Sequence, residues 1–239
     1  MHRRARSQEA KLRRAEDLLD AARVLAADLG GVRHLTLAAV TEAAGLHPSA
    51  VRRYFASKEE LLLELAERGW NQWRDALTAH LADARGLGPR EVASQVSTTI
   101  SALPLFCDLL THVPLSLEGE VDIERARRYK TNSFAAYDAI VDAIVSSGTM
   151  TTAQVQDLIT AALGMTANLW QLSHPTATLA QLYAQEPRWG HAALDFRERL
   201  TRLLEATAIG LAAADTLPRI TSGKTRSATF TAADGATKR

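Results

Sequence analysis

Cysteine is almost absent from this chain of 239 residues, in which Cys107 is the single example. A disulfide within the chain is therefore excluded, and one thiol is compatible with a reducing compartment. A lone cysteine is more often a small buried hydrophobic residue than a redox sensor, so we expect Cys107 to be packed in a core.

Long apolar runs are also missing. None reaches 18 residues, and the N-terminal segment is charged instead of forming the apolar stretch of a secretion signal. We therefore expect a cytoplasmic protein that has no membrane partner.

Common catalytic motifs do not occur. The sequence contains no GxSxG, no HExxH and no glycine-rich phosphate-binding loop. Asp108 and His112 are four residues apart, which would suit half of a metal site, but no second pair follows at ligand spacing. We expect no enzyme activity, no catalytic residue, no cofactor and no metal.

Strand patterns are lacking as well, because no segment of four to eight residues alternates apolar and polar side chains with β-branched enrichment. Apolar residues instead recur at three- and four-residue steps, which predicts helices. The expected fold is all-α. Its helices span about residues 7–29, 37–45, 48–55, 58–85, 89–102, 104–114, 121–147, 152–173, 176–186 and 191–214.

Local signals place the first four helices. Gly30 and Gly31 end the first, and Thr36 is suited to cap the second. Pro48 fits the first position of the third, and Ser57 begins the fourth as the first residue of a capping box.

Charge is distributed unevenly although the net charge is only +1. Residues 1–58 contain 11 Lys and Arg against 6 Asp and Glu, a charge of +5, whereas residues 59–239 contain 17 against 21, a charge of −4. A basic first quarter favours a polyanion as the partner of that end.

Three short helices with a glycine turn between the second and third form a helix-turn-helix unit, whose third helix enters the major groove of DNA. In that helix Ala50 and Val51 can face inward, which leaves Arg52 and Arg53 outward. An arginine side chain can form hydrogen bonds to the base edge of guanine or bind a phosphate group. The alternative is a solvated helix with two ordinary surface arginines.

Residues of about 12–63 resemble the DNA-binding domain of the TetR family of transcriptional regulators. The resemblance lies in the stretches "LLDAARVLAADLG", "LTLAAVTEAAGL" and "HPSAVRRYFASKEELL". It implies that Thr36 and Lys58 contact phosphates and that residues 47–54 form the recognition surface. The candidate DNA-binding residues are Thr36, His47, Pro48, Ser49, Ala50, Arg52, Arg53, Tyr54 and Lys58.

Three positions depart from the family pattern. The family usually has Ser or Thr at the position of His47, often Gly at that of Ser49 and commonly Tyr at that of Arg52. The role of Arg52 therefore cannot be copied from the family's tyrosine.

The resemblance also implies a DNA-binding domain at 1–57 and a helical ligand-binding and dimerisation domain at 58–217, with 58–85 as connecting helix. Residues 218–239 are polar, rich in threonine and poor in large apolar residues, so we expect a disordered tail there. It implies a homodimer through the C-terminal helices, with 152–172 and 191–214 as candidates, on a palindromic operator in double-stranded DNA. We expect a repressor that a small-molecule effector releases. The rival interpretation is a helical protein-interaction module without DNA binding.

Candidates for lining an effector pocket are aromatic residues, methionine, leucines beside them, and polar residues among apolar neighbours, although most are better explained as core. They are Trp73, Phe106, Leu109, His112, Tyr137, Met165, Asn168, Trp170 and His174, with Trp70 and Leu105 beside them.

Overall fold

Helices are the regular elements of the part of the chain that the structure describes. The computed structural model describes residues 2–186, 188–189 and 195–214, without the side chains of residues 2–8, 48 and 49. Its elements are α1 (His2–Asp28), η1 (Val32–His34), α2 (Leu37–Ala43), η2 (Pro48–Arg53), α3 (Lys58–Leu81), α4 (Pro89–Ser101), α5 (Pro104–His112), η3 (Val113–Leu117), η4 (Glu118–Glu120), α6 (Ile123–Ser147), α7 (Thr152–Ser173), α8 (Ala177–Gln185) and α9 (Phe196–Ala214). Within these residues no strand forms, so the predicted all-α class is confirmed. The expected disordered tail lies outside the described residues.

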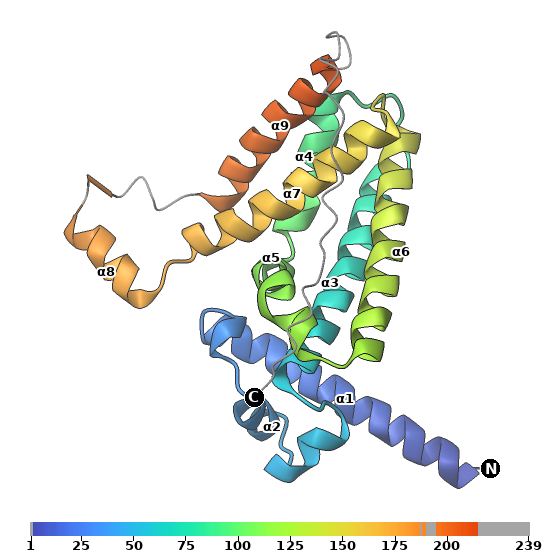
Figure 1. Ribbon diagram of the computed structural model, residues 1–239, viewed down its shortest axis with the longest axis vertical. Helices are drawn as coiled ribbons and strands as arrows, with labels where there is room; N and C mark the ends of the chain where they lie inside the picture. The colour runs from blue at the N-terminus through green and yellow to red at the C-terminus, as the bar shows by residue number, and fades with distance from the viewer. Residues whose placement is uncertain (1, 187, 190–194, 215–239) are drawn as a thin grey trace, which may run out of the picture.

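The N-terminal unit consists of α1, η1, α2 and η2, which lie together below the other helices in Figure 1. The predicted cap of α2 is present, because Thr36 Oγ1 accepts a hydrogen bond from Ala39 N at 3.1 Å. Gly45 has φ 65°, which lets the chain turn sharply after α2. The third helix differs from expectation: it is a 3₁₀ helix that ends at Arg53, in keeping with the shortness of the segment.

The C-terminal helices form a bundle in which α3 packs on α6, α4 packs on α9, and α7 lies between α5 and α9. Two tryptophans of α3 anchor its core. Trp73 is fully buried and donates its indole N–H to Thr99 Oγ1 at 3.1 Å, while the Trp70 indole N–H donates to Tyr129 Oη at 3.1 Å. Without these hydrogen bonds, the two buried indole N–H groups would have no partner.

Ion pairs connect α3 to its neighbours on both sides. Arg125 of α6 is buried and reaches Glu64 at 3.3 Å and Glu67 at 3.0 Å, both on α3. On the other side, Arg68 of α3 donates two hydrogen bonds to the Glu16 carboxylate of α1. Helix α3 is thus tied to the bundle and to the N-terminal unit at once.

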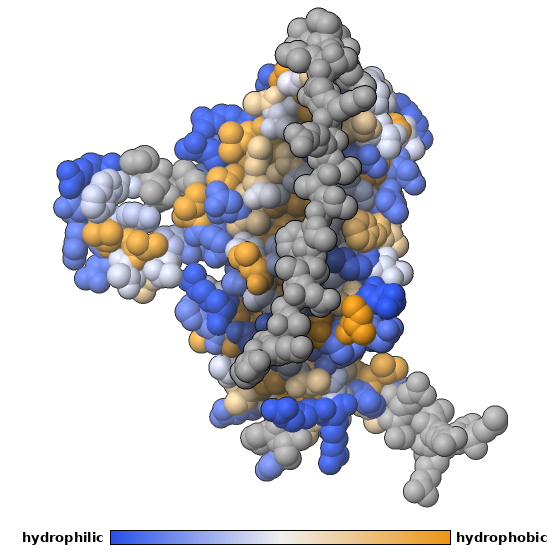
Figure 2. Space-filling model, viewed as in Figure 1, coloured by the Kyte–Doolittle hydropathy of each residue, from blue (hydrophilic) through white to orange (hydrophobic). Residues whose placement is uncertain are grey.

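Helix α8 stands away from the bundle in Figure 1, and Figure 2 shows apolar residues on this projecting arm. Leu179 and Leu182 are exposed there. Among the described residues no single helix is long and apolar enough to cross a membrane; α4 and the segment Pro104–Glu120 reach that length and composition only together, across a 91° bend.

Candidate functional site

The η2 segment presents the two adjacent arginines to solvent. Val51 and Phe55 are buried at 4% and 6% exposure, which fixes the orientation of the segment on the N-terminal core. Arg52 and Arg53 are both exposed, and Tyr54 is half-buried against that core. The arginines therefore lie on a surface whose orientation is set by apolar packing.

Two helix starts lie beside η2 along the chain. Thr36 caps α2 and is exposed, and Lys58 is the first residue of α3. Lys58 Nζ donates to the backbone carbonyl of Arg33 at 3.2 Å, which brings η1 and the start of α3 together. Arg33, exposed on η1, is a further basic residue near the predicted phosphate contacts. Arg33 is not among the residues predicted from the sequence, because it is 25 residues from Lys58 and only the fold brings the two together.

The remaining predicted DNA contacts fall on the same short segment. His47 is exposed and Ala50 is half-buried, whereas the side chains of Pro48 and Ser49 lie outside the described structure. Figure 2 shows hydrophilic side chains at the lower end of the molecule, where Figure 1 places α2.

A cavity of about 1000 Å³ lies where the N-terminal unit meets the bundle. Its walls come from α1, the Gly30–Gly31 turn, α3, the start of α5 and the end of α7. Three predicted pocket residues line it: Phe106, Trp170 and His174. Leu105 lines it as well. A volume of this size accepts a drug-sized molecule.

The other pocket candidates lie elsewhere. Trp73 and Leu109 are fully buried in the core, and His112 and Met165 are half-buried without lining the cavity. Tyr137, on α6, packs against Phe134 with ring centroids 6.4 Å apart, and Asn168, on α7, is exposed.

Asp108 is a wall residue that the sequence singled out only as half of a metal site. One carboxylate oxygen accepts the backbone N–H of Val32 at 2.7 Å, and the other accepts the Gln171 amide at 2.8 Å. His112 Nε2 lies 3.8 Å away. Burial alone would raise the pKa of Asp108, but His112 and the two hydrogen bonds lower it, and the net shift is downward. The signal in the sequence was an acid within the apolar run "LPLFCDLL".

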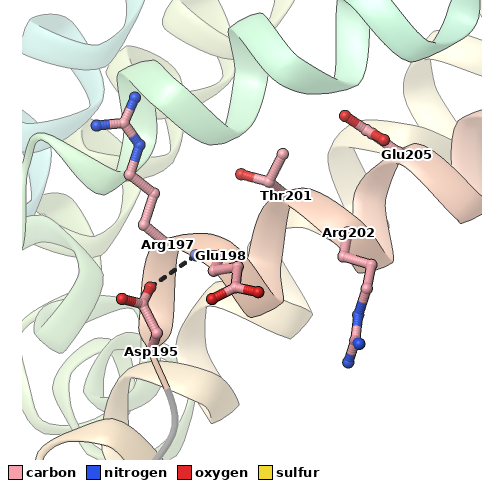
Figure 3. Close-up of a pocket in the computed structure, with 6 residues that line it drawn as sticks. All are labelled: Asp195, Arg197, Glu198, Thr201, Arg202 and Glu205. Atoms are coloured by element: carbon pink, nitrogen blue, oxygen red, sulfur yellow. Dashed lines mark hydrogen bonds between the residues drawn. The ribbon is translucent and has the colours of Figure 1, made fainter.

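A second, polar hollow of about 510 Å³ lies over the start of α9. Figure 3 shows its six labelled side chains, all from this helix or the residue before it, with Arg202 pointing away from the others. Asp195 accepts the backbone N–H of Glu198 at 2.8 Å, so part of this polarity serves to cap the helix.

Cys107 is fully buried and its thiol lies 3.2 Å from the Ile100 carbonyl oxygen. Burial raises its pKa to about 12, so the thiolate needed for redox chemistry is scarce at neutral pH. Among the described residues, no group of three or more His, Cys, Asp or Glu side chains is placed to hold a metal ion.

Two family models match the chain and together cover most of it. Residues 18–65 match the model described as bacterial regulatory proteins of the tetR family, and residues 67–215 match the tetracyclin repressor-like C-terminal domain. No curated protein matches the sequence significantly.

Similar solved structures include a possible TetR family transcriptional regulator from Streptomyces coelicolor A3(2). It is 19% identical with a TM-score of 0.51, and the match covers 85% of this chain and 99% of that chain, which indicates a shared fold. A TetR-family transcriptional regulator from Mesorhizobium loti MAFF303099 is 15% identical over 85% of this chain and 97% of its own, with a TM-score of 0.46. FadR from Bacillus subtilis, in complex with stearoyl-CoA, is 16% identical over 82% and 98%, with a TM-score of 0.47.

Proposed function

This chain belongs to the TetR family of bacterial regulatory proteins, and we propose that it is a repressor that binds a palindromic operator as a homodimer and leaves it when a small-molecule effector binds. Membership of the family implies regulation of transcription through DNA binding. Regulators of this family are in general not enzymes. Because the protein acts on DNA, we expect it in the cytoplasm.

The observation that carries the DNA-binding proposal is the exposed Arg52–Arg53 pair on η2. Buried Val51 and Phe55 hold the backbone of the segment in place, so both arginines already stand on one exposed surface. We assign one arginine to a phosphate and the other to a base edge, since guanidinium groups serve both roles. Lys58 adds a second phosphate contact at the start of α3.

The homodimer is supported by two helices with small residues. Gly164 of α7 and Gly210 of α9 are exposed, and no atom lies within 4 Å of a Cβ built at either position. Ile209 beside Gly210 is 42% exposed. Such a surface lets a second copy approach closely, and two recognition segments held about one DNA turn apart read a palindrome.

The effector acts, in this proposal, by shifting a population of conformations. Effector binding against the C-terminal helices α3, α5 and α7, which line the cavity, favours a position of α3 in which the two recognition segments no longer match the spacing of the operator. DNA affinity then falls because the two segments can no longer both make their arginine contacts.

The first test is selection of bound sequences from a random duplex pool by the purified protein, with Arg52→Ala and Arg53→Ala in parallel. Arg127→Ala serves as control, because Arg127 is an exposed arginine of α6 that pairs locally with Glu124. We expect an enriched palindrome that both η2 variants bind more weakly and the control binds normally. The variant that relaxes the sequence preference identifies the arginine that reads a base.

The protein-interaction alternative predicts a different result. A folded dimer that enriches no sequence at low salt would contradict the DNA-binding proposal and favour a protein partner. Groove binding must also weaken steeply with ionic strength, whereas apolar partner binding does not.

A further inference from the structure

The cavity between the N-terminal unit and the bundle has mainly apolar walls. Leu65, Leu103 and Phe106 contribute from α3 and the start of α5, and Trp170 contributes from α7. The Trp170 ring packs against two other rings. The His174 ring stacks on it with centroids 3.8 Å apart, and the Phe196 ring meets it edge-on with centroids 5.1 Å apart. A flat apolar body can therefore pack against a wall that is already ordered.

The charges in the walls favour a cation. Each wall arginine already has a carboxylate partner: Arg68 is hydrogen-bonded to Glu16, and Arg23 lies 3.6 Å from Asp20. Asp28 also lines the cavity, and within the described residues it forms no ion pair. The third carboxylate of the wall, after Asp20 and Asp28, is Asp108, which is buried at 6% exposure. The nearest basic group to it is His112, 3.8 Å away, which carries a charge only when protonated.

Asp108 also holds the N-terminal unit in place. Its bond to Val32 N–H crosses from α5 to the first residue of η1, four residues before Thr36 caps α2. Gly31 permits this approach: its φ is 134°, and a Cβ there would lie 3.2 Å from Asp108 Oδ2. The same carboxylate thus faces the cavity and fixes the segment that leads into the DNA-binding helices.

We propose that this cavity binds an amphipathic organic cation, whose apolar body packs on Phe106 and Trp170 and whose ammonium group binds Asp108. The ammonium shares the carboxylate with Val32 N–H and so weakens the contact between α5 and η1. This identifies the class of effector and the route of its action, and the route rests on the proposed DNA-binding function.

The test uses three probes with one apolar body: 1-pyrenemethylammonium, 1-pyrenemethanol and 1-pyrenecarboxylate. Their dissociation constants are measured by fluorescence anisotropy on the full chain. Hydrogen bonds between charged groups contribute more binding free energy than neutral ones, so we expect the ammonium to bind about tenfold tighter than the alcohol. The carboxylate should bind weakest. Asp108→Asn keeps an oxygen for Val32 N–H and should bring the ammonium to the affinity of the alcohol. Asp195→Asn, in the hollow on α9, should change nothing.

A second variant keeps the proposal testable if Asp108→Asn does not fold. Val24 of α1 lines the cavity and is 51% exposed, so Val24→Arg is tolerated by the fold. It should weaken binding of the ammonium and strengthen binding of the carboxylate. Equal binding of the three probes, or an ammonium preference that neither variant reduces, would overturn the proposal.

DNA binding is followed separately on the selected duplex. The ammonium probe should lower DNA affinity of the unmodified protein about tenfold, and that of Asp108→Asn much less. Specific DNA binding without an ammonium preference would reject the cation site and leave the regulator intact. An Asp108-dependent ammonium preference in a protein that selects no DNA would support the site and reject the regulator.

Discussion

Gly69 lets α3 and α5 approach each other beside the cavity, and its replacement by alanine tests that contact. A Cβ at this position would lie 2.3 Å from Phe106 Cδ2 and 2.9 Å from Phe106 Cβ. The first distance is more than 1 Å shorter than an ordinary carbon–carbon contact of about 3.5–4.0 Å. Because the second involves Phe106 Cβ, turning the ring cannot remove the clash. The Trp70 ring packs against the Phe106 ring with centroids 5.5 Å apart, so α5 itself must move.

Two opposing effects determine how much Gly69→Ala changes the free energy of unfolding. Alanine in place of glycine inside a helix stabilises by about 1 kcal/mol. Overpacking a filled core costs about 1–3 kcal/mol, and a backbone shift belongs at the upper end of that range. We therefore expect Gly69→Ala to lower the free energy of unfolding by about 1–2 kcal/mol.

The matched control is Gly119→Ala in η4. Nothing lies within 4 Å of a Cβ built there and φ is not positive, so alanine should stabilise by about 0.4–1 kcal/mol through the unfolded state. Urea titrations followed by circular dichroism, at one protein concentration because a dimer's stability depends on it, give both values. If Gly69→Ala stabilised the protein as Gly119→Ala does, the close contact between α3 and Phe106 would be refuted.

Two further predictions concern charge. Lys58→Ala should reduce the slope of log DNA affinity against log salt concentration by about 0.9 per protomer, so the variant dimer should lose about tenfold less affinity than the unmodified dimer between about 50 and 200 mM salt. Arg127→Ala should leave this slope unchanged. An unchanged slope for Lys58→Ala would contradict its phosphate contact. Because the folded pKa of Asp108 is lowered, its stabilisation is present above the unfolded pKa of about 3.9 and is lost as pH falls through the folded value. Acid titrations of stability should therefore be shallower for Asp108→Asn below about pH 5, and identical curves would contradict this.

The sequence predicted those features of the fold that depend on neighbouring residues. Thr36 caps α2 and Ser57 caps α3, whose Glu60 N–H donates to Ser57 Oγ at 3.1 Å. Each cap involves residues three positions apart, and such local chemistry is visible in a single sequence. The 3₁₀ geometry of η2 was not predicted, since the same short pattern fits either type of helix.

The cavity could not be predicted in this way. Helical periodicity identifies the buried face of a helix but not the element that covers it. Trp73 and Phe106 carry the same signal and are both buried, at 0% and 2% exposure, yet only Phe106 also lines the cavity. The contact between Val32 and Asp108 joins residues 76 positions apart, and only the folded chain brings them together.

Helix α3 runs from the predicted DNA-binding face to the cavity. Its first residue, Lys58, lies at the predicted phosphate contact, while Arg68 lines the cavity and Gly69 touches α5. Eleven residues of helix separate Lys58 from Gly69, or about 16 Å at the rise of an α-helix. A tilt of about 5° around the Gly69 contact would move Lys58 by roughly 1.4 Å. In the homodimer that we propose, the same displacement at both half-sites would change the spacing of the two recognition segments, so a small shift at the cavity would be enough to weaken operator binding.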